Sequence, residues 1–127
     1  MSDHDALLNL SQSLLDSIVE GNWEAYCELC DESLTCFEPE ARGHVVEGLA
    51  FHKFYFDGQP GAKRINTTMA SPHVRLMGDS AIVCYTRLTQ FIDSTNSPVT
   101  KAVEETRVWQ KMDGKWKHVH FHRSLPT

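Results

Sequence analysis

Apolar residues in the first part of the chain recur at helical spacing. Between residues 5 and 20 they fall three or four positions apart, which predicts an amphipathic helix with one buried face. Gly21 follows and is expected to end this helix, because glycine easily adopts the left-handed conformation of a helix terminus. Asn22 can then cap a second, shorter helix over residues 23–30.

The rest of the chain turns from helical to strand-like patterns. A short strand is expected over 34–38 and a helix over 49–57, followed by a loop rich in Gly and Pro over 57–64. Segments rich in β-branched and aromatic residues then predict four strands, at 65–77, 80–92, 102–112 and 115–124. Helices followed mostly by strands indicate an α+β fold, with the helices on one face of an antiparallel sheet.

The predicted strands are long, and both of their faces carry apolar side chains. Long strands in a small sheet must curl, so the sheet should enclose a concave interior of the kind that holds a pocket. On the strand over 80–92, Ile82 and Leu88 lie on one face, and Val83 and Tyr85 on the other. One layer of helices cannot cover both faces, so we expect self-association through the outer face.

Length and charge narrow the class of protein. The 127 residues are expected to form a single domain over 1–127. A net charge of −5 argues against a nucleic-acid partner, which requires a basic face. No segment approaches the roughly 20 apolar residues of a membrane span, and no basic region precedes the first apolar residues, so the cytosol is the expected compartment.

The four cysteines are Cys27, Cys30, Cys36 and Cys84. The first two have the C-x-x-C spacing of redox pairs and zinc knuckles, but there is no second such pair and no following pair of histidines. We therefore expect buried free thiols and predict no metal or cofactor from these residues.

Three arginines on the predicted strands are the main candidates for chemistry. A two-residue turn at Asp113-Gly114 would point Arg107 and Arg123 to opposite faces, whereas a three-residue bulged turn would place them on one face. Residue types alone allow either turn. If Arg87 joins the other two, three guanidiniums that cannot lose their protons converge in one recess.

Such a cluster has two interpretations. It can bind a carboxylate or phosphate through fork-like hydrogen bonds. Alternatively, the arginines pair with nearby carboxylates or reach solvent; the candidate partners are Glu38, Glu40, Glu104 and Glu105.

Histidines raise the question of a metal site. His118, His120 and His122 alternate and are expected on one face, but the sequence specifies no further ligand, so surface or hydrogen-bonded histidines are the expectation. His52 lies among aromatic residues and is either a satisfied core residue or a pocket group that protonates near neutral pH.

Four stretches of the chain carry a family resemblance: "FEPEARGHVVEGLAFHKFYF", "YTRLTQFID", "EETRVWQKMDGKW" and "VHFHRS". They resemble the association (hub) domain of calcium/calmodulin-dependent protein kinase II, a member of the nuclear transport factor 2-like superfamily. The resemblance extends from about residue 6 to residue 124. It implies a cone-shaped fold, with the N-terminal helix wrapped by a strongly curved antiparallel sheet, and dimers that assemble into a stacked double ring.

The resemblance also implies a function without phosphotransfer chemistry. In the kinase, the hub gathers catalytic domains so that neighbours phosphorylate one another. This chain has no Gly-rich loop, H-R-D or D-F-G motif, no room for a kinase fold, and no basic amphipathic helix for calmodulin. No catalytic residue is therefore assigned.

The resemblance further implies a ligand pocket. Its arginines match Arg87, Arg107 and Arg123, its histidine matches His52, and its tyrosine matches Tyr26. In the family this pocket takes small carboxylates and can accept acidic or phosphorylated peptide segments. The match favours a shared face for Arg107 and Arg123, and hence the bulged turn. The loop over 57–64 is shorter than its counterpart and lacks a tryptophan found in some members, and neither His118 nor Cys27 belongs to the family pattern.

Two hypotheses result. The first is a free-standing hub, an oligomeric scaffold with an anion-binding pocket, whose partners are its own copies, a small carboxylate or phosphate, and a kinase or other acidic peptide segment. The second is a small cone-fold enzyme, such as an isomerase, dehydratase or hydrolase, acting on an anionic substrate. The expected pocket residues suit anion binding better than proton transfer, although Glu38 or Glu40 could act as a base.

Overall fold

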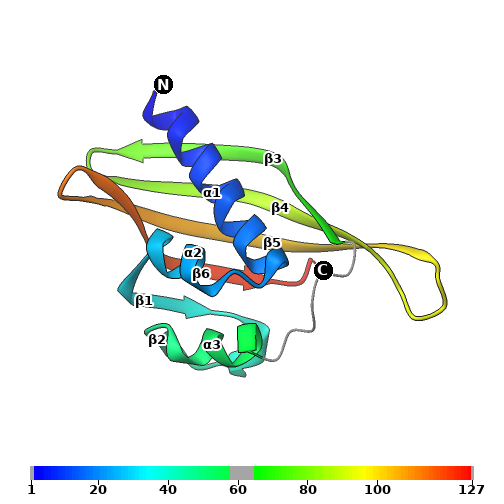
Figure 1. Ribbon diagram of the computed structural model, residues 1–127. Helices are drawn as coiled ribbons and strands as arrows, with labels where there is room; N and C mark the ends of the chain where they lie inside the picture. Colours follow the sequence, from blue (N-terminus) through cyan, green and yellow to red (C-terminus); the bar gives the residue numbers. More distant parts are fainter. Residues whose placement is uncertain (1, 58–64, 127) are drawn as a thin grey trace.

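The computed structural model describes residues 2–57 and 65–126, so most of the loop predicted over 57–64 lies outside the described residues. The helices are α1 (Asp3–Glu20), α2 (Trp23–Leu29) and α3 (Ala50–Asp57), with a 3₁₀ turn, η1, at Pro39–Ala41. The strands are β1 (Cys30–Phe37), β2 (Val46–Glu47), β3 (Ile65–Met77), β4 (Ser80–Ile92), β5 (Pro98–Met112) and β6 (Lys115–Ser124). They form one sheet in the order β2-β1-β6-β5-β4-β3 (Figure 1).

The first helix begins and ends where the sequence predicts. Ser2 caps its start by accepting a hydrogen bond from the backbone N–H of Asp5. Gly21 ends it with φ at 67° and donates its own N–H to the carbonyl of Ile18. The buried face of α1, which includes Leu7 and Leu14, lies against the sheet.

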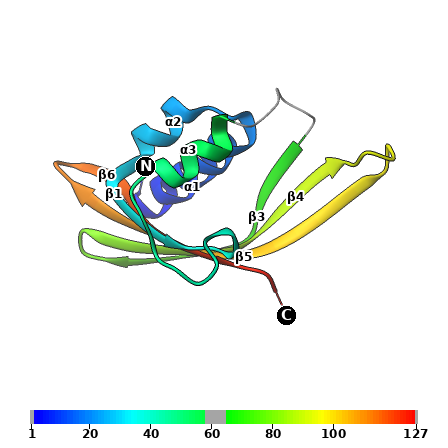
Figure 2. The same cartoon turned by 90° about the horizontal axis from the view of Figure 1, so that it is seen from below.

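The sheet is strongly curved, and all three helices lie on its concave side (Figure 2). This arrangement agrees with the predicted α+β cone. The sheet is not wholly antiparallel, because β1 pairs with β6 in parallel. A parallel pair needs a long crossover, and here the whole segment from β2 to β5 supplies it.

The turn between β5 and β6 differs from the expected bulged turn. Met112 pairs with Lys115, and both turn residues have positive φ, 50° at Asp113 and 79° at Gly114, which is a two-residue type I′ turn. The bulge lies within β6 instead, where the pairing of this strand with β5 shifts by one residue opposite Val108 and Trp109 of β5.

The bulge decides which face the arginines occupy. Trp109 pairs with His118 but Val108 pairs with His120, so β6 carries one extra residue at this point. Beyond the bulge Arg107 lies opposite Phe121 and Glu105 opposite Arg123, which gives the two arginines the same face. The shared face was therefore predicted correctly, but through the wrong turn.

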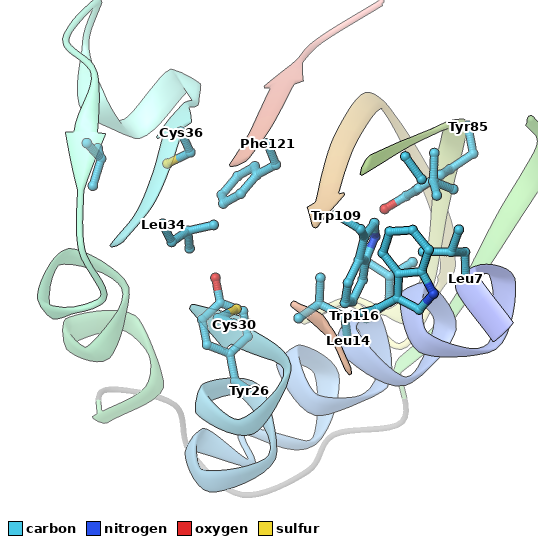
Figure 3. Close-up of a cluster of buried hydrophobic side chains, with 14 residues drawn as sticks. Leu7, Leu14, Tyr26, Cys30, Leu34, Cys36, Tyr85, Trp109, Trp116 and Phe121 are labelled. Atoms are coloured by element: carbon cyan, nitrogen blue, oxygen red, sulfur yellow. The ribbon is translucent and has the colours of Figure 1, made fainter. Parts of the chain in front are cut away.

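The core fills the space between the helices and the concave face of the sheet. Figure 3 shows Trp109, Trp116 and Leu7 gathered at one end of this core, and Leu34, Cys36 and Phe121 at the other. All four cysteines are free thiols, as predicted, but only Cys30 and Cys36 are buried, whereas Cys27 and Cys84 are half-buried. No helix among the described residues is both long and apolar enough to cross a membrane.

Candidate functional site

A recess of about 250 Å³ opens between the helices and the inner face of the sheet. The five residues predicted for a ligand site all line it: Tyr26, His52, Arg87, Arg107 and Arg123. They come from α2, α3, β4, β5 and β6. Acidic and aromatic side chains complete the lining, among them Glu38, Glu40, Phe56 and Phe121.

Arg107 forms the floor of the recess and is 1% exposed. Its Nε donates to the Tyr85 hydroxyl at 2.8 Å and its Nη2 to Glu105 Oε1 at 3.1 Å. Its Nη1 lies 3.4 Å from His118 Nε2, and its guanidinium carbon lies 4.6 Å from the centre of the Phe121 ring. A guanidinium has five N–H donors, so these contacts leave two for a ligand.

Glu105 is shared by two of the arginines. One carboxylate oxygen accepts from Arg107 and from the Tyr85 hydroxyl, and the other lies 3.4 Å from Arg87 Nη1. Burial pushes the pKa of Glu105 upward, but attraction to Arg107 and Arg87 outweighs it and holds the pKa below the ordinary value. Glu105 is therefore a buried carboxylate kept charged by two guanidiniums.

Arg123 is paired with two other carboxylates. Its Nη2 contacts Glu40 Oε1 and lies 3.5 Å from Glu38 Oε2. Three arginines and two glutamates thus line the recess, and Glu105, which pairs with two of these arginines without lining the recess, brings the group into balance of formal charge. The pairing interpretation of the sequence is correct for Glu38, Glu40 and Glu105, while Arg87 Nε is buried without a hydrogen-bond partner.

His52 lies at the centre of a second polar group in the recess wall. Its Nε2 is 2.8 Å from Glu38 Oε1 and 3.7 Å from the Cys36 sulfur. Both neighbours approach the same ring nitrogen, so they do not form a nucleophile triad, in which the carboxylate and the thiol would use different nitrogens. Nδ1 is buried without a partner. Burial, with some repulsion by Glu38, raises the pKa of the Cys36 thiol to about 12, so the free thiol stays protonated.

Tyr26 belongs to the aromatic wall of the recess. Its ring stacks on that of Trp23, with the ring centres 5.6 Å apart. The ring centres of Phe56 and His52 lie 5.0 Å and 6.3 Å from that of Tyr26. Burial raises the pKa of its hydroxyl well above the ordinary value, so this group acts as a neutral hydrogen-bonding partner.

The histidines of β6 do not share a face, contrary to the sequence prediction. The bulge places His118 in the core, stacked on Phe121 at 5.7 Å, with Nδ1 3.4 Å from the Cys30 sulfur. His120 instead hydrogen-bonds Thr35 at 2.8 Å, and with His122 it lines a groove on the outer face.

Sequence reasoning missed Tyr85 and His118 as contacts of Arg107. Tyr85 could have been found, because the face shared with Arg87 follows from the alternation along β4. His118 could not, because its orientation depends on where the bulge falls in β6. Chemically, the recess can hold a carboxylate through the unused guanidinium donors, and the Glu38–His52 pair can hold or move a proton.

Comparisons with known proteins agree with this architecture. The family model of the calcium/calmodulin dependent protein kinase II association domain matches residues 3–126. The subunit delta of this kinase from Oryctolagus cuniculus is 48% identical over 121 residues, and the alpha chain from Drosophila melanogaster is 49% identical. These matches cover 93% of this chain, which spans about a quarter (23%) of each of those proteins.

Solved structures give the same assignment. The hub homology domain from Chlamydomonas reinhardtii superposes with a TM-score of 0.92 and 52% identity over the whole of both chains. The association domain of the C. elegans kinase gives 0.91 and 46%, covering 95% of this chain and 94% of the other. An NTF2-like protein from Cytophaga hutchinsonii, 19% identical over 99% of this chain and 100% of the other, shares the fold with a TM-score of 0.82. The chain therefore belongs to the calcium/calmodulin-dependent protein kinase II association domain family and has the nuclear transport factor 2-like fold.

Proposed function

We propose that residues 1–127 form one oligomerisation hub, whose copies assemble through dimers into a closed, stacked ring. The observation that carries this proposal is the superposition with a hub homology domain over the full length of both chains. The partner to be gathered would be a kinase catalytic domain, whether it is carried by the same polypeptide or by another. The hub itself would contribute local concentration and no phosphotransfer.

Exposed apolar side chains at the sheet ends and after β6 support self-association. Large apolar side chains stay more than 39% exposed in a single copy; they include Phe37, Leu76, Met77, Ile92 and Leu125. Large apolar side chains that stay exposed in one copy can be covered at an interface between copies.

Assembly is tested by the mass of the particle in solution. Light scattering coupled to gel filtration should give a mass far above that of a dimer, and sedimentation velocity should show the same species. A monomer or a plain dimer at micromolar concentration would contradict the ring.

We also propose that the recess binds a small carboxylate. Support comes from the two unused N–H donors of Arg107, from the unpartnered Nε of Arg87, and from the position of Arg123 on the same face. A carboxylate would accept from these donors in fork-like geometry. Because the formal charges of the recess already balance, a monovalent ligand is expected to bind more favourably than a divalent one.

A thermal-shift measurement with acetate tests this site. Ligand at about 100 times its dissociation constant should stabilise the wild type by about 2.7 kcal/mol. Arg87→Gln should remove most of this stabilisation, because it removes unused donors while leaving Glu105 paired with Arg107. Arg75→Gln is the matched control, since Arg75 is exposed on β3 and should leave the shift intact. An unchanged shift in Arg87→Gln would place acetate elsewhere.

A second candidate function, a small cone-fold enzyme, is favoured by one observation, the buried Glu38–His52 pair at 2.8 Å. Such a pair could abstract a proton next to a carbonyl. Wild-type protein would be incubated in D₂O with 3-oxo and 3-hydroxy carboxylates while NMR follows exchange at carbon 2. Exchange that His52→Gln abolishes would support catalysis, and ligands recovered unchanged would count against it.

A further inference from the structure

Two side chains that line the recess, Glu38 and His52, lie close to the buried thiol of Cys36, which does not line it. The Cys36 sulfur, a carboxylate oxygen of Glu38 and a ring nitrogen of His52 all lie within 4.8 Å of one another. Cys36 is fully buried, and the side chains of Glu38 and His52 are 5% and 10% exposed. They come from β1, from the residue that follows it and from α3, so the fold, and not a sequence motif, creates the cluster.

We propose that Cys36, Glu38 and His52 bind one divalent zinc ion, with a fourth coordination position open to the recess. Sulfur, imidazole and carboxylate together suit Zn²⁺, and three protein ligands with one open position are typical of zinc sites that bind a further ligand. This set is separate from the histidines of β6, which the sequence suggested for a metal and the structure divides between two faces.

Two of the three distances between donor atoms lie close to those of a tetrahedral ion, and the third, from sulfur to oxygen, is at most 4.8 Å. Ordinary Zn–S, Zn–N and Zn–O bond lengths place the sulfur about 3.6 Å from the nitrogen and the nitrogen about 3.4 Å from the oxygen. The observed separations are 3.7 Å and 2.8 Å. Glu38 therefore has to move away from the ring by roughly 0.6 Å to admit the metal.

The surroundings can hold the ligands in place. Glu38 uses Oε1 toward His52, while its other oxygen lies 3.5 Å from Arg123, which orients the carboxylate from behind. On metal binding the imidazole proton moves from Nε2 to Nδ1, which is buried without a hydrogen-bond partner, so this N–H stays unpaired in the described residues. The thiol proton leaves to solvent, so one proton is released for each ion bound.

The metal would also change what the recess attracts. Its three arginines are balanced by Glu38, Glu40 and the paired Glu105, so Zn²⁺ together with a Cys36 thiolate adds one net positive charge. Glu38 and His52 line the recess, so the open position faces the arginines. A carboxylate could then bind the metal and a guanidinium together. This last step rests on the proposed carboxylate function, whereas the metal site does not.

Cobalt titration tests the site directly, because Co²⁺ takes the same ligands as Zn²⁺ and absorbs light. Reduced protein, freed of metal with a chelator, should bind one equivalent and show a thiolate-to-cobalt charge-transfer band with the visible bands of a tetrahedral ion. Added Zn²⁺ should abolish these bands. Cys36→Ser should lose the charge-transfer band, and Glu38→Gln should weaken binding tenfold or more. Cys84→Ser is the matched control, because this half-buried thiol contacts Thr106 away from the cluster.

No band in the wild type, a band that survives Cys36→Ser, or one lost in Cys84→Ser would overturn the proposal. If Cys36→Ser does not fold, X-ray absorption of the zinc-loaded wild type decides instead: one sulfur with nitrogen or oxygen neighbours is expected, and no sulfur or several would overturn it. Acetate stabilisation is measured with and without zinc. If acetate stabilises the metal-free protein and the protein binds no zinc, the proposed carboxylate site is supported and the proposed zinc site is refuted.

Discussion

His118 is a buried histidine whose neutral form the fold requires. It is fully buried, and its Nε2 faces the guanidinium of Arg107. Burial first, and then repulsion by Arg107, lowers its pKa well below the ordinary value of 6.5. The folded state therefore binds fewer protons than the unfolded state once the pH falls below about 6.5.

The free energy of unfolding should therefore decrease as the pH is lowered below about 6.5. We expect the free energy of unfolding to drop by up to about 2 kcal/mol from His118 between pH 7 and pH 5. Urea denaturation at several pH values measures the drop. His118→Gln, which keeps a hydrogen-bond acceptor for Arg107, should remove this part of the pH dependence. His44→Gln, at an exposed position, should not, and equal slopes in the two variants would contradict the assignment.

Glu105 pairs with the buried Arg107 and the partly buried Arg87, so its removal should cost more free energy of unfolding than the loss of one ion pair. Glu105→Gln leaves Arg87 and Arg107 without their shared charge, and breaking a buried pair in this way costs about 3–5 kcal/mol. Chemical denaturation measures the loss. Glu104→Gln is the control, because Glu104 is the exposed neighbour of Glu105 and its substitution should change the free energy of unfolding by less than about 0.5 kcal/mol. A similar small loss in both variants would show that Glu105 is dispensable.

The residue types of the site were more predictable than their pairing. Strand alternation and the family resemblance together predicted that the three arginines would lie near one another. Because arginines stay charged, a cluster of them also had to be paired with anions. The pairing of each carboxylate with its guanidinium could not be predicted from the sequence. Glu38 and Glu40 approach Arg123 from the end of another strand, and no local sequence pattern specifies that approach.

At the scale of elements, strand bounds were predicted well and register was not. The strands at 65–77, 80–92 and 115–124 agree with the structure, whereas β1 and β5 begin four residues earlier than expected. The local sequence suits a two-residue turn and a three-residue bulged turn equally; the structure has the two-residue turn and places the bulge within β6, next to His118, which stacks on Phe121 in the core.

The β5–β6 turn should be sensitive to a side chain at its second residue. Gly114 has φ at 79°, so Gly114→Ala should lower the free energy of unfolding by about 1 kcal/mol. Asp113→Gly, which also suits a positive φ, should stay within about 0.5 kcal/mol of the wild type. Urea denaturation of both variants tests the turn, and an unaffected Gly114→Ala would contradict the assigned turn type.

At the scale of the whole molecule, a ring would make stability depend on protein concentration. Association stabilises the folded state by mass action, so the melting temperature should rise as the protein is concentrated. Calorimetry over a hundredfold range of concentration, at constant buffer, measures the effect. A melting temperature independent of concentration, together with a small particle mass, would indicate that copies do not associate.

The extra residue in β6 divides this strand into two halves, because the alternation of side chains between the two faces of the sheet shifts by one residue at the bulge. Trp116 and His118 lie between the turn and the bulge, whereas Phe121 and Arg123 lie beyond the bulge, where β1 pairs with His120, Phe121 and His122. A longer or shorter hairpin loop would therefore disturb the tryptophan end of the core and leave the arginine end in place. The bulge thus separates the residues that line the recess from changes in the length of the β5–β6 turn. Such changes can alter the free energy of unfolding without altering the ligand that the recess binds.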